Sequence, residues 1–212
     1  AFGGKYGTNI NINFSRIQSI DTTHTSQYKY NSDLFAIGNR LYYQDFTINV
    51  SKKFSSKFKG SLSYVNMIYD KDILENEGAP KYGKIKGNFL IMDGTYRIDD
   101  KNAIRFELQH LWAKQDSAAH IGDTRYGNWI TALIEYSISP SFYFSVSDDY
   151  NYGNEFDDLK IHYYSASFTY VVGSNRIQLT YGKQNQGIIC VGGVCRTVPA
   201  SNGLYLSISS SF

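Results

Sequence analysis

The chain alternates apolar and polar residues, one for one, over many short segments. In the last segment, GLYLSISSSF, Leu204, Leu206, Ile208 and Phe212 share one parity, and small polar residues fill the other. Successive side chains of a β-strand point to opposite faces, so each segment is predicted to be a strand with one apolar and one polar face. This period of two constrains the fold more than any other feature of the sequence.

Ten segments with this period are separated by connections of alternating length. The segments cover residues 6–16, 42–52, 58–68, 85–98, 104–112, 130–138, 142–147, 163–172, 176–181 and 203–212. Short connections lie near Ser55, Asp99, Ser139 and Gly173, and long ones cover residues 18–40, 70–83, 114–127, 151–159 and 184–201. Antiparallel strands of a barrel give this alternation when one end has tight turns and the other has loops. No segment is convincing as a helix.

The two faces of the predicted strands differ in composition. The polar face is rich in Ser, Thr, Asn and Gly and poor in Lys, unlike a solvated strand face. The apolar face is large, and aromatic residues stand at both of its ends. Those at the short-turn end are Tyr6, Phe58, Tyr96, Phe142, Tyr170 and Phe212, and those at the loop end are Tyr42, Trp112, Tyr150, His162, Tyr164 and Tyr181. Two aromatic girdles around an aliphatic belt are typical of a transmembrane β-barrel. The predicted fold class is therefore an all-β, transmembrane, antiparallel up-and-down β-barrel of about ten strands. A soluble β-sandwich or lipocalin-like barrel is the alternative.

The closing strand resembles the terminal signature of bacterial outer-membrane barrels, which the insertion machinery reads. Leu204, Leu206, Ile208 and Phe212 match that signature, and Ser210 departs from it. The longer stretch CVGGVCRTVPASNGLYLSISSSF resembles the end of an uncharacterised family of bacterial outer-membrane proteins of unknown function, whose members are longer than this chain. The resemblance implies an architecture and a location, and it implies no catalytic residues.

One domain is expected over residues 1–212. Two arrangements stay open at this point. Ten is an even number of strands, so the chain could close on itself. Alternatively, it forms the C-terminal part of a longer protein with a larger barrel.

Two cysteines flank a predicted hairpin turn. In CVGGV, a two-residue turn at Gly192 and Gly193 would pair Val191 with Val194 and place Cys190 opposite Cys195. Directly opposite residues lie within disulfide range, and an exported protein meets an oxidising compartment. A disulfide between Cys190 and Cys195 is predicted as a structural staple on a loop. A redox or metal pair would need further ligands, and none lies nearby in the sequence.

Charged residues of inward parity are expected to face the barrel interior. They are Asp45, Asp93, Arg97, Arg105, Glu107, Glu135 and Arg176. In a narrow, side-chain-filled barrel they would form a polar network of Arg–carboxylate pairs, because an unpaired buried charge is costly. In a wider barrel they would line a charged constriction of a pore.

No enzyme, cofactor or metal site is predicted. The four histidines are His24, His110, His120 and His162, and no two of them have a metal-ligand spacing. No nucleophile motif surrounds a serine. The net charge of +2 is nearly balanced and does not indicate nucleic-acid binding.

The sequence therefore predicts an integral outer-membrane protein of a Gram-negative bacterium, with a periplasmic C-terminus and extracellular long loops. Two functions compete. One is a structural or accessory barrel subunit of an outer-membrane assembly, whose lumen is largely filled by side chains such as Tyr43, Trp129, Tyr143, Tyr163 and Tyr205. The other is a porin-like passive channel for small solutes. Expected partners are outer-membrane lipid and lipopolysaccharide, the barrel insertion machinery and other outer-membrane subunits, with no nucleic acid.

Overall fold

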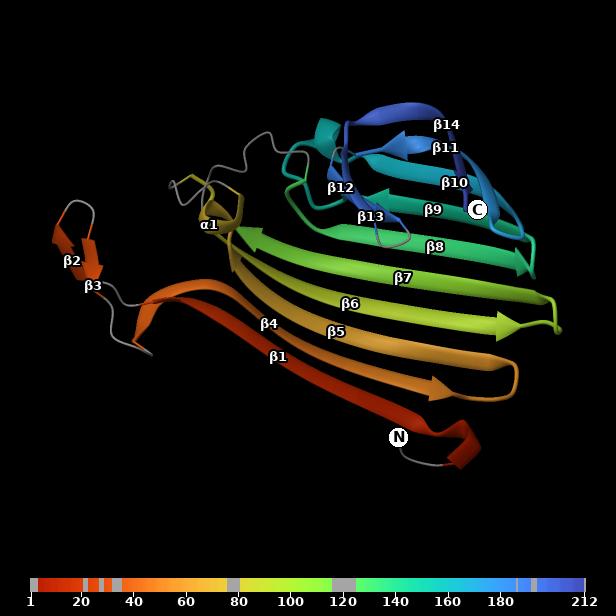
Figure 1. The fold of residues 1–212 in the computed structure, drawn as a ribbon, viewed down its shortest axis with the longest axis horizontal. Coiled ribbons are helices and arrows are strands. Elements are labelled where there is room, and N and C mark those ends of the chain that lie inside the picture. Colours follow the sequence, from red (N-terminus) through yellow and green to blue (C-terminus); the bar gives the residue numbers. More distant parts are fainter. Residues whose placement is uncertain are drawn as a thin grey trace.

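The structure, a computed structural model, describes residues 4–20, 23–26, 29–31, 36–75, 81–115, 125–185, 187–191 and 194–211. Ten strands form one antiparallel sheet (Figure 1). They are β1 (Thr8–Ile20), β4 (Ile37–Lys53), β5 (Phe58–Asp70), β6 (Lys84–Arg97), β7 (Asn102–Gln115), β8 (Trp129–Ile138), β9 (Phe142–Tyr150), β10 (His162–Val172), β11 (Asn175–Gln184) and β14 (Ser201–Ser210). The ten predicted strands and their up-and-down order are confirmed, and most are longer than the sequence suggested.

Smaller elements lie at the connections and at the start of the described chain. The hairpins β2 (Thr23–Ser26) with β3 (Lys29–Asn31), and β12 (Gly187–Val191) with β13 (Val194–Val198), occupy two of the long loops. Short helical turns are η1 (Gly4–Tyr6), α1 (Lys71–Glu75) and η3 (Asp157–Leu159). No helix among the described residues is long and apolar enough to cross a membrane.

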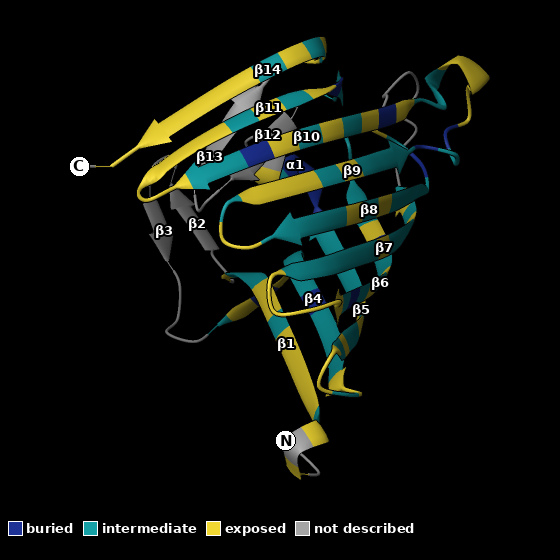
Figure 2. Ribbon diagram, turned by 90° about the vertical axis from the view of Figure 1, so that its right-hand side faces the viewer, coloured by how far each residue is buried: buried dark blue, intermediate teal, exposed yellow. Residues whose placement is uncertain are grey.

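The sheet is strongly curved but open, which corrects the prediction of a closed barrel. Its hydrogen-bonded order runs from β1 at one edge to β14 at the other, with each strand beside its neighbour in sequence within the sheet. Exposed residues run along both edge strands (Figure 2). Closure requires a matching tilt and stagger of all strands, and bulges commonly supply the extra bend. Within this sheet the only register shifts lie in the β1–β4 pair, after Ile17, so the remaining pairs add no such bend.

The two faces of the sheet differ in exposure, as the alternation predicts. On the convex face, apolar side chains are exposed from one edge of the sheet to the other. Examples across the sheet are Ile12 (66%), Ile134 (60%), Val146 (62%) and Leu206 (65%). The register carries this face from strand to strand: Ile10 lies opposite Val50, Val50 opposite Leu62, and Leu62 opposite Met92. The result is a continuous apolar surface on the outside of the curve.

Candidate functional site

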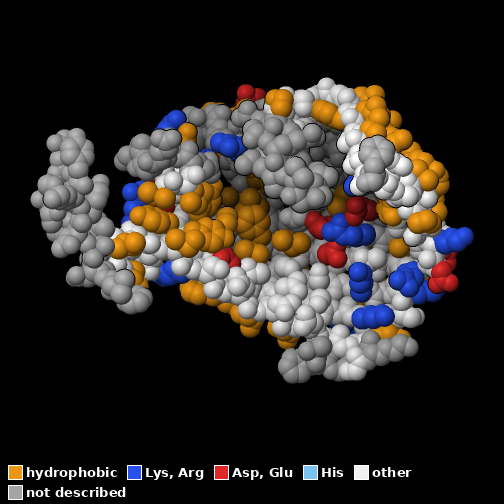
Figure 3. Space-filling model, viewed as in Figure 1, with side chains coloured by type: hydrophobic (Ala, Val, Ile, Leu, Met, Phe, Trp, Pro, Cys, Tyr) orange, Lys and Arg blue, Asp and Glu red, His pale blue; other side chains and the backbone are white. Residues whose placement is uncertain are grey.

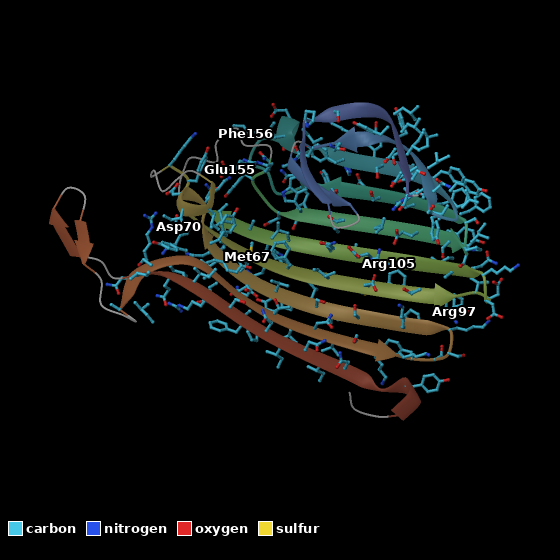
Figure 4. The ribbon with its side chains drawn as sticks, in the orientation of Figure 1. Met67, Asp70, Arg97, Arg105, Glu155 and Phe156 are labelled. Atoms are coloured by element: carbon cyan, nitrogen blue, oxygen red, sulfur yellow. The ribbon has the colours of Figure 1, made fainter. Side chains whose placement is uncertain are left out.

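A charged cluster occupies the part of the concave face nearer the short turns (Figures 3 and 4). Arg105 on β7 lies at its centre. Its Nε donates to Asp93 Oδ2 at 2.7 Å and its Nη1 to Glu135 Oε2 at 2.5 Å, while Nη2 pairs with Glu107. The register explains the grouping, because Asp93 lies opposite Glu107 and Arg105 opposite Glu135. One guanidinium thus holds three carboxylates, and their formal charges sum to −2.

Four of the seven residues predicted to face inward contact one another in this cluster: Asp93, Arg105, Glu107 and Glu135. The other predicted members have separate neighbours. Asp45 is buried and accepts hydrogen bonds from Asn13 and Thr47. Arg176 donates to Gln178, and the backbone of Arg97 donates to Lys57 at a short turn. The network is therefore a local cluster on β6, β7 and β8 and not a continuous lattice.

The loop-end part of the concave face is apolar, which the sequence analysis missed. Val65, Met67, Phe89, Ile91 and Leu111 have inward parity and are half-buried. The signal was present: around residues 64–69, 89–92 and 110–113 both parities are apolar, so the strict alternation is lost there. A strand segment that is apolar on both faces is covered on both faces. Concave-face contacts are therefore expected at these positions.

A cavity of about 220 Å³ opens on this apolar part. Its floor follows the sheet register, with Met67 opposite Gly87 and Gly87 opposite Ala113. The small residues Gly87 and Ala113 leave room between the larger rows on either side. A Cβ atom at Gly87 would lie 3.2 Å from the Phe89 ring and 3.5 Å from Leu111. The cavity therefore depends on the missing side chain of Gly87.

The segment Arg125–Gly127 covers one side of the cavity and is held in place from several directions. Asn151 and Asn154, both nearly inaccessible, donate to the carbonyl oxygen of Tyr126 at 2.9 and 3.1 Å. The indole of Trp129 donates to the Arg125 carbonyl at 3.1 Å. Gly127 has a φ of +113° and lies against the backbone of Gly153, with no space for a side chain. The wall of the cavity is thus a fixed part of the fold.

Lys71 brings a buried positive charge to the cavity lining. Its side chain is almost fully buried, and Nζ lies 4.8 Å from the centre of the Tyr82 ring. The neighbouring acids have partners of their own. Asp70 pairs with Arg40 at 2.9 Å, and Asp72 accepts the backbone N–H groups of residues 81–83. These hydrogen bonds, that from Tyr82 first, hold the pKa of Asp72 below its usual value.

Two histidines form polar contacts on the convex face at the loop end. His110 Nε2 lies 2.6 Å from the hydroxyl of Tyr152, and His162 Nδ1 lies 2.7 Å from Asp148 Oδ2. The His162 ring stacks on Tyr150 with centroids 3.8 Å apart. The stacking of His162 on Tyr150 agrees with the predicted place of both residues in the loop-end aromatic level. The partner Asp148 was missed, although its even number in β9 gives it outward parity.

The remaining predicted site residues lie near the end of the chain. Cys190 is opposite Cys195 in the β12–β13 register, as predicted. Their side chains and the Gly192–Gly193 turn lie outside the described residues, so the disulfide stays a prediction. Leu204, Leu206 and Ile208 are exposed on the convex face of β14, and Phe212 lies outside the described residues. Groups of metal-binding side chains are absent from the part of the chain that the structure describes.

Comparison with protein-family models places the chain in a family that matches it over residues 1–212. The chain belongs to DUF6029, a family of unknown function. This finding agrees with the expected membership in an uncharacterised family. No curated protein and no solved structure matches the chain. Membership of DUF6029 therefore supplies no activity, and the functional argument depends on the two faces of the sheet.

Proposed function

We propose that this chain is a membrane-spanning β-wall of a Gram-negative outer membrane, with a structural or accessory role in an outer-membrane assembly. The observation that carries the proposal is the continuous, exposed apolar convex face. Large apolar side chains at 40–67% exposure on most strands of one sheet would be costly in water. In a bilayer the same face contacts lipid, and the concave face takes the polar groups.

Side chains at the border of the apolar face support this orientation. On the convex face, Trp112 and the stacked pair of Tyr150 and His162 lie toward the loop end, and the stacked pair of Phe142 and Tyr170 lies at the short-turn end. The next row toward the loops runs Arg16, Gln44, Ile68, Lys86 and Lys114 in register. Its three cations are exposed. Cations beside an aromatic level suit the anionic headgroups of outer-membrane lipid and lipopolysaccharide.

The side chains of the concave face favour a filled interior and argue against a wide channel. Trp129 stacks on Tyr163 at 5.9 Å, and Tyr163 is buried. The apolar half around Phe89 adds further bulk on the same face. These inward rings favour a concave face that is occupied by side chains, as expected for an accessory wall without a wide channel.

The membrane proposal is tested by one charge placed on each face. Val146 lies midway along β9 on the convex face and is 62% exposed. In water, Val146→Arg would change the free energy of unfolding by less than ~0.5 kcal/mol, as at other exposed sites. At the bilayer midplane it should cost about 2–4 kcal/mol. The measurement is urea unfolding of the chain refolded into lipid vesicles, followed by tryptophan fluorescence.

The matched control is Ser207→Arg, which places the same side chain on the concave parity of β14, where Ser207 is exposed. It should leave stability and insertion nearly unchanged. Heat-modifiable migration in detergent gels should accompany insertion. Equal effects of the two substitutions, or a β-rich monomer that stays in solution without detergent, would contradict the proposal.

A second function, passive passage of small solutes, is favoured by the Arg105 cluster. Glu135 and Asp93 are 42% and 28% exposed at their side chains, so their charge faces the space inside the curve. An acidic surplus at this point would favour cations. Planar-bilayer recordings should then show discrete conductance steps with cation preference, which Glu135→Gln reduces. The absence of steps from inserted protein would support the filled accessory wall.

A further inference from the structure

We propose that the loop-end cavity of the concave face binds a small uncharged apolar molecule, about the size of one substituted aromatic ring or a short hydrocarbon chain. The cavity measures about 220 Å³, and most of the surface that it exposes is apolar. Concave and mostly apolar cavities are the usual sites of small ligands. The proposal depends on the cavity alone and not on a membrane location.

The apolar floor of the cavity is the first reason to expect a ligand. Phe89 lies opposite Leu111 and Met67 opposite Gly87, so apolar residues meet across the neighbouring strands β5, β6 and β7. Strand segments that are apolar on both faces are normally covered on both faces. In the described part of the chain, residues 125–127 line one side of this floor, and a cavity is left beside them. An apolar ligand would remove the remaining surface from water, which is favourable.

The size of the cavity limits the ligand. A dry apolar cavity of roughly 150 Å³ is enough for a benzene molecule, so a cavity of about 220 Å³ accepts one ring with a short substituent. Gly87 is the narrow point of the floor, because a Cβ atom there would lie 3.2 Å from the Phe89 ring and 3.5 Å from Leu111. A large side chain at position 87 would therefore take the space of the ligand.

The charged groups around the cavity favour an uncharged ligand. Lys71 and Arg125 line the cavity, and both already take part in interactions within the protein. Lys71 Nζ, for example, lies 4.8 Å from the centre of the Tyr82 ring. Lys114 is exposed and has convex parity. An ionised ligand would have to displace such contacts or lose its hydration without compensation, which is costly. A neutral ligand avoids both costs.

The walls are preformed, which is what separates this cavity from a surface dimple. Two nearly inaccessible asparagines, Asn151 and Asn154, fix the Tyr126 carbonyl, and Gln115 donates to the carbonyl of Tyr82 at 2.8 Å. A binding site that is already ordered loses little conformational entropy when the ligand arrives. The cavity is therefore ready to bind without a closing movement.

The two methionines of the chain provide the test and its internal control. Met67 lines the cavity, whereas Met92 has convex parity and is 43% exposed. Methyl NMR of the purified chain, with isotope-labelled methionine methyl groups, follows both residues during titration with benzyl alcohol. The Met67 resonance should shift and reach a plateau, and Met92 should show no saturable shift. Benzoate and benzylammonium, which have the same shape, should bind at least about tenfold more weakly.

Gly87→Leu should abolish the saturable shift of Met67, because its side chain fills the floor of the cavity. Its control is Gly203→Leu, also of concave parity, where a Cβ meets nothing within 4 Å; the shift should be unchanged. If Gly87→Leu does not fold, the smaller step Ala113→Val, in the same lining, should weaken binding. The comparison of the three probes on the unchanged chain requires no substitution.

A lipid chain is another source of the same hydrocarbon chemistry, and a spin label separates the two. A lipid with a nitroxide at the end of its acyl chain should leave the Met67 methyl resonance sharp. Strong broadening of that resonance would mean that a lipid chain enters the cavity. This broadening, the absence of a saturable shift at Met67, equal binding of the three probes, or an undiminished shift in a folded Gly87→Leu would each overturn the proposal.

Discussion

The turn-end and loop-end parts of the concave face share the strands β6 and β7, yet they are built from different interactions. At the turn end, Arg105 gathers three carboxylates that the register places side by side. At the loop end, half-buried apolar rows surround a cavity, and amide side chains fix its wall. The first region relies on charge balance, and the second on packing and on hydrogen bonds that hold a loop.

The difference teaches that a strand's two-residue period does not set the chemistry of a face along its whole length. Gln109 marks the border, since it donates to Glu107 on one side and lies next to Leu111 along the concave parity on the other. Substitutions at the turn end should therefore change stability by unbalancing charge. Substitutions at the loop end should change it by loosening the loop that covers the cavity. Three predictions examine that division.

The largest effect is expected from Arg105→Met. Removal of the guanidinium leaves three carboxylates with no cation among them, and Asp93 directly opposite Glu107. Loss of one partner costs ~3–5 kcal/mol for a fully buried pair, and partial exposure here reduces that to about 2 kcal/mol. Urea unfolding in lipid vesicles measures it. Arg176→Met, where the partner is the neutral Gln178, is the control and should cost far less; equal losses would show that the cluster is not a unit.

An intermediate effect is expected from Asn151→Ala at the loop end. The substitution removes the 2.9 Å hydrogen bond to the Tyr126 carbonyl at a fully inaccessible position. The free energy of unfolding should fall by about 1 kcal/mol, because the Tyr126 carbonyl then keeps only the hydrogen bond from Asn154. Hydrogen exchange should quicken around residues 125–129 and stay unchanged around Arg105. A uniform change over the whole sheet would contradict the division into two regions.

The smallest effect is local and depends on pH. The backbone N–H groups of Lys81, Tyr82 and Gly83 lower the pKa of Asp72. A depressed folded-state pKa gives stability that is present above the ordinary carboxyl pKa and is lost as the pH falls through the folded value. Amide resonances of residues 81–83 should therefore shift in acid, below the ordinary aspartate range. Asp72→Asn should remove this acid transition; its persistence would assign the transition to another group.

Much of the fold could be predicted because its cause is local. Alternation specified ten strands, and the Gly-Gly pair specified that Cys190 faces Cys195. Closure could not be predicted in the same way, because it depends on tilt and stagger summed over all strands. The sequence suggested a closed barrel, and the sheet is open from β1 to β14.

Within the candidate site, Asp93, Arg105, Glu107 and Glu135 could be assigned to one face by parity. Their contact could be recognised only from the strand register, which places Asp93 opposite Glu107 and Arg105 opposite Glu135. The cavity could have been suspected where alternation fails, as in the stretch YVNMIY. Its wall could not, since Asn151 and Tyr126 meet only through two long connections that approach each other in space.

The open edges described for β1 and β14 have a consequence for assembly. In the described part of the chain, each edge strand pairs on one side only, so a row of N–H and C=O groups faces outward. Such a row is a template for another strand, and in hydrocarbon every unpaired group costs several kcal/mol. The stretch from Thr8 to Ser15 carries no charge that would discourage pairing. When both edges of this sheet are unpaired, they should therefore pair with strands of other copies. Self-association should increase with protein concentration.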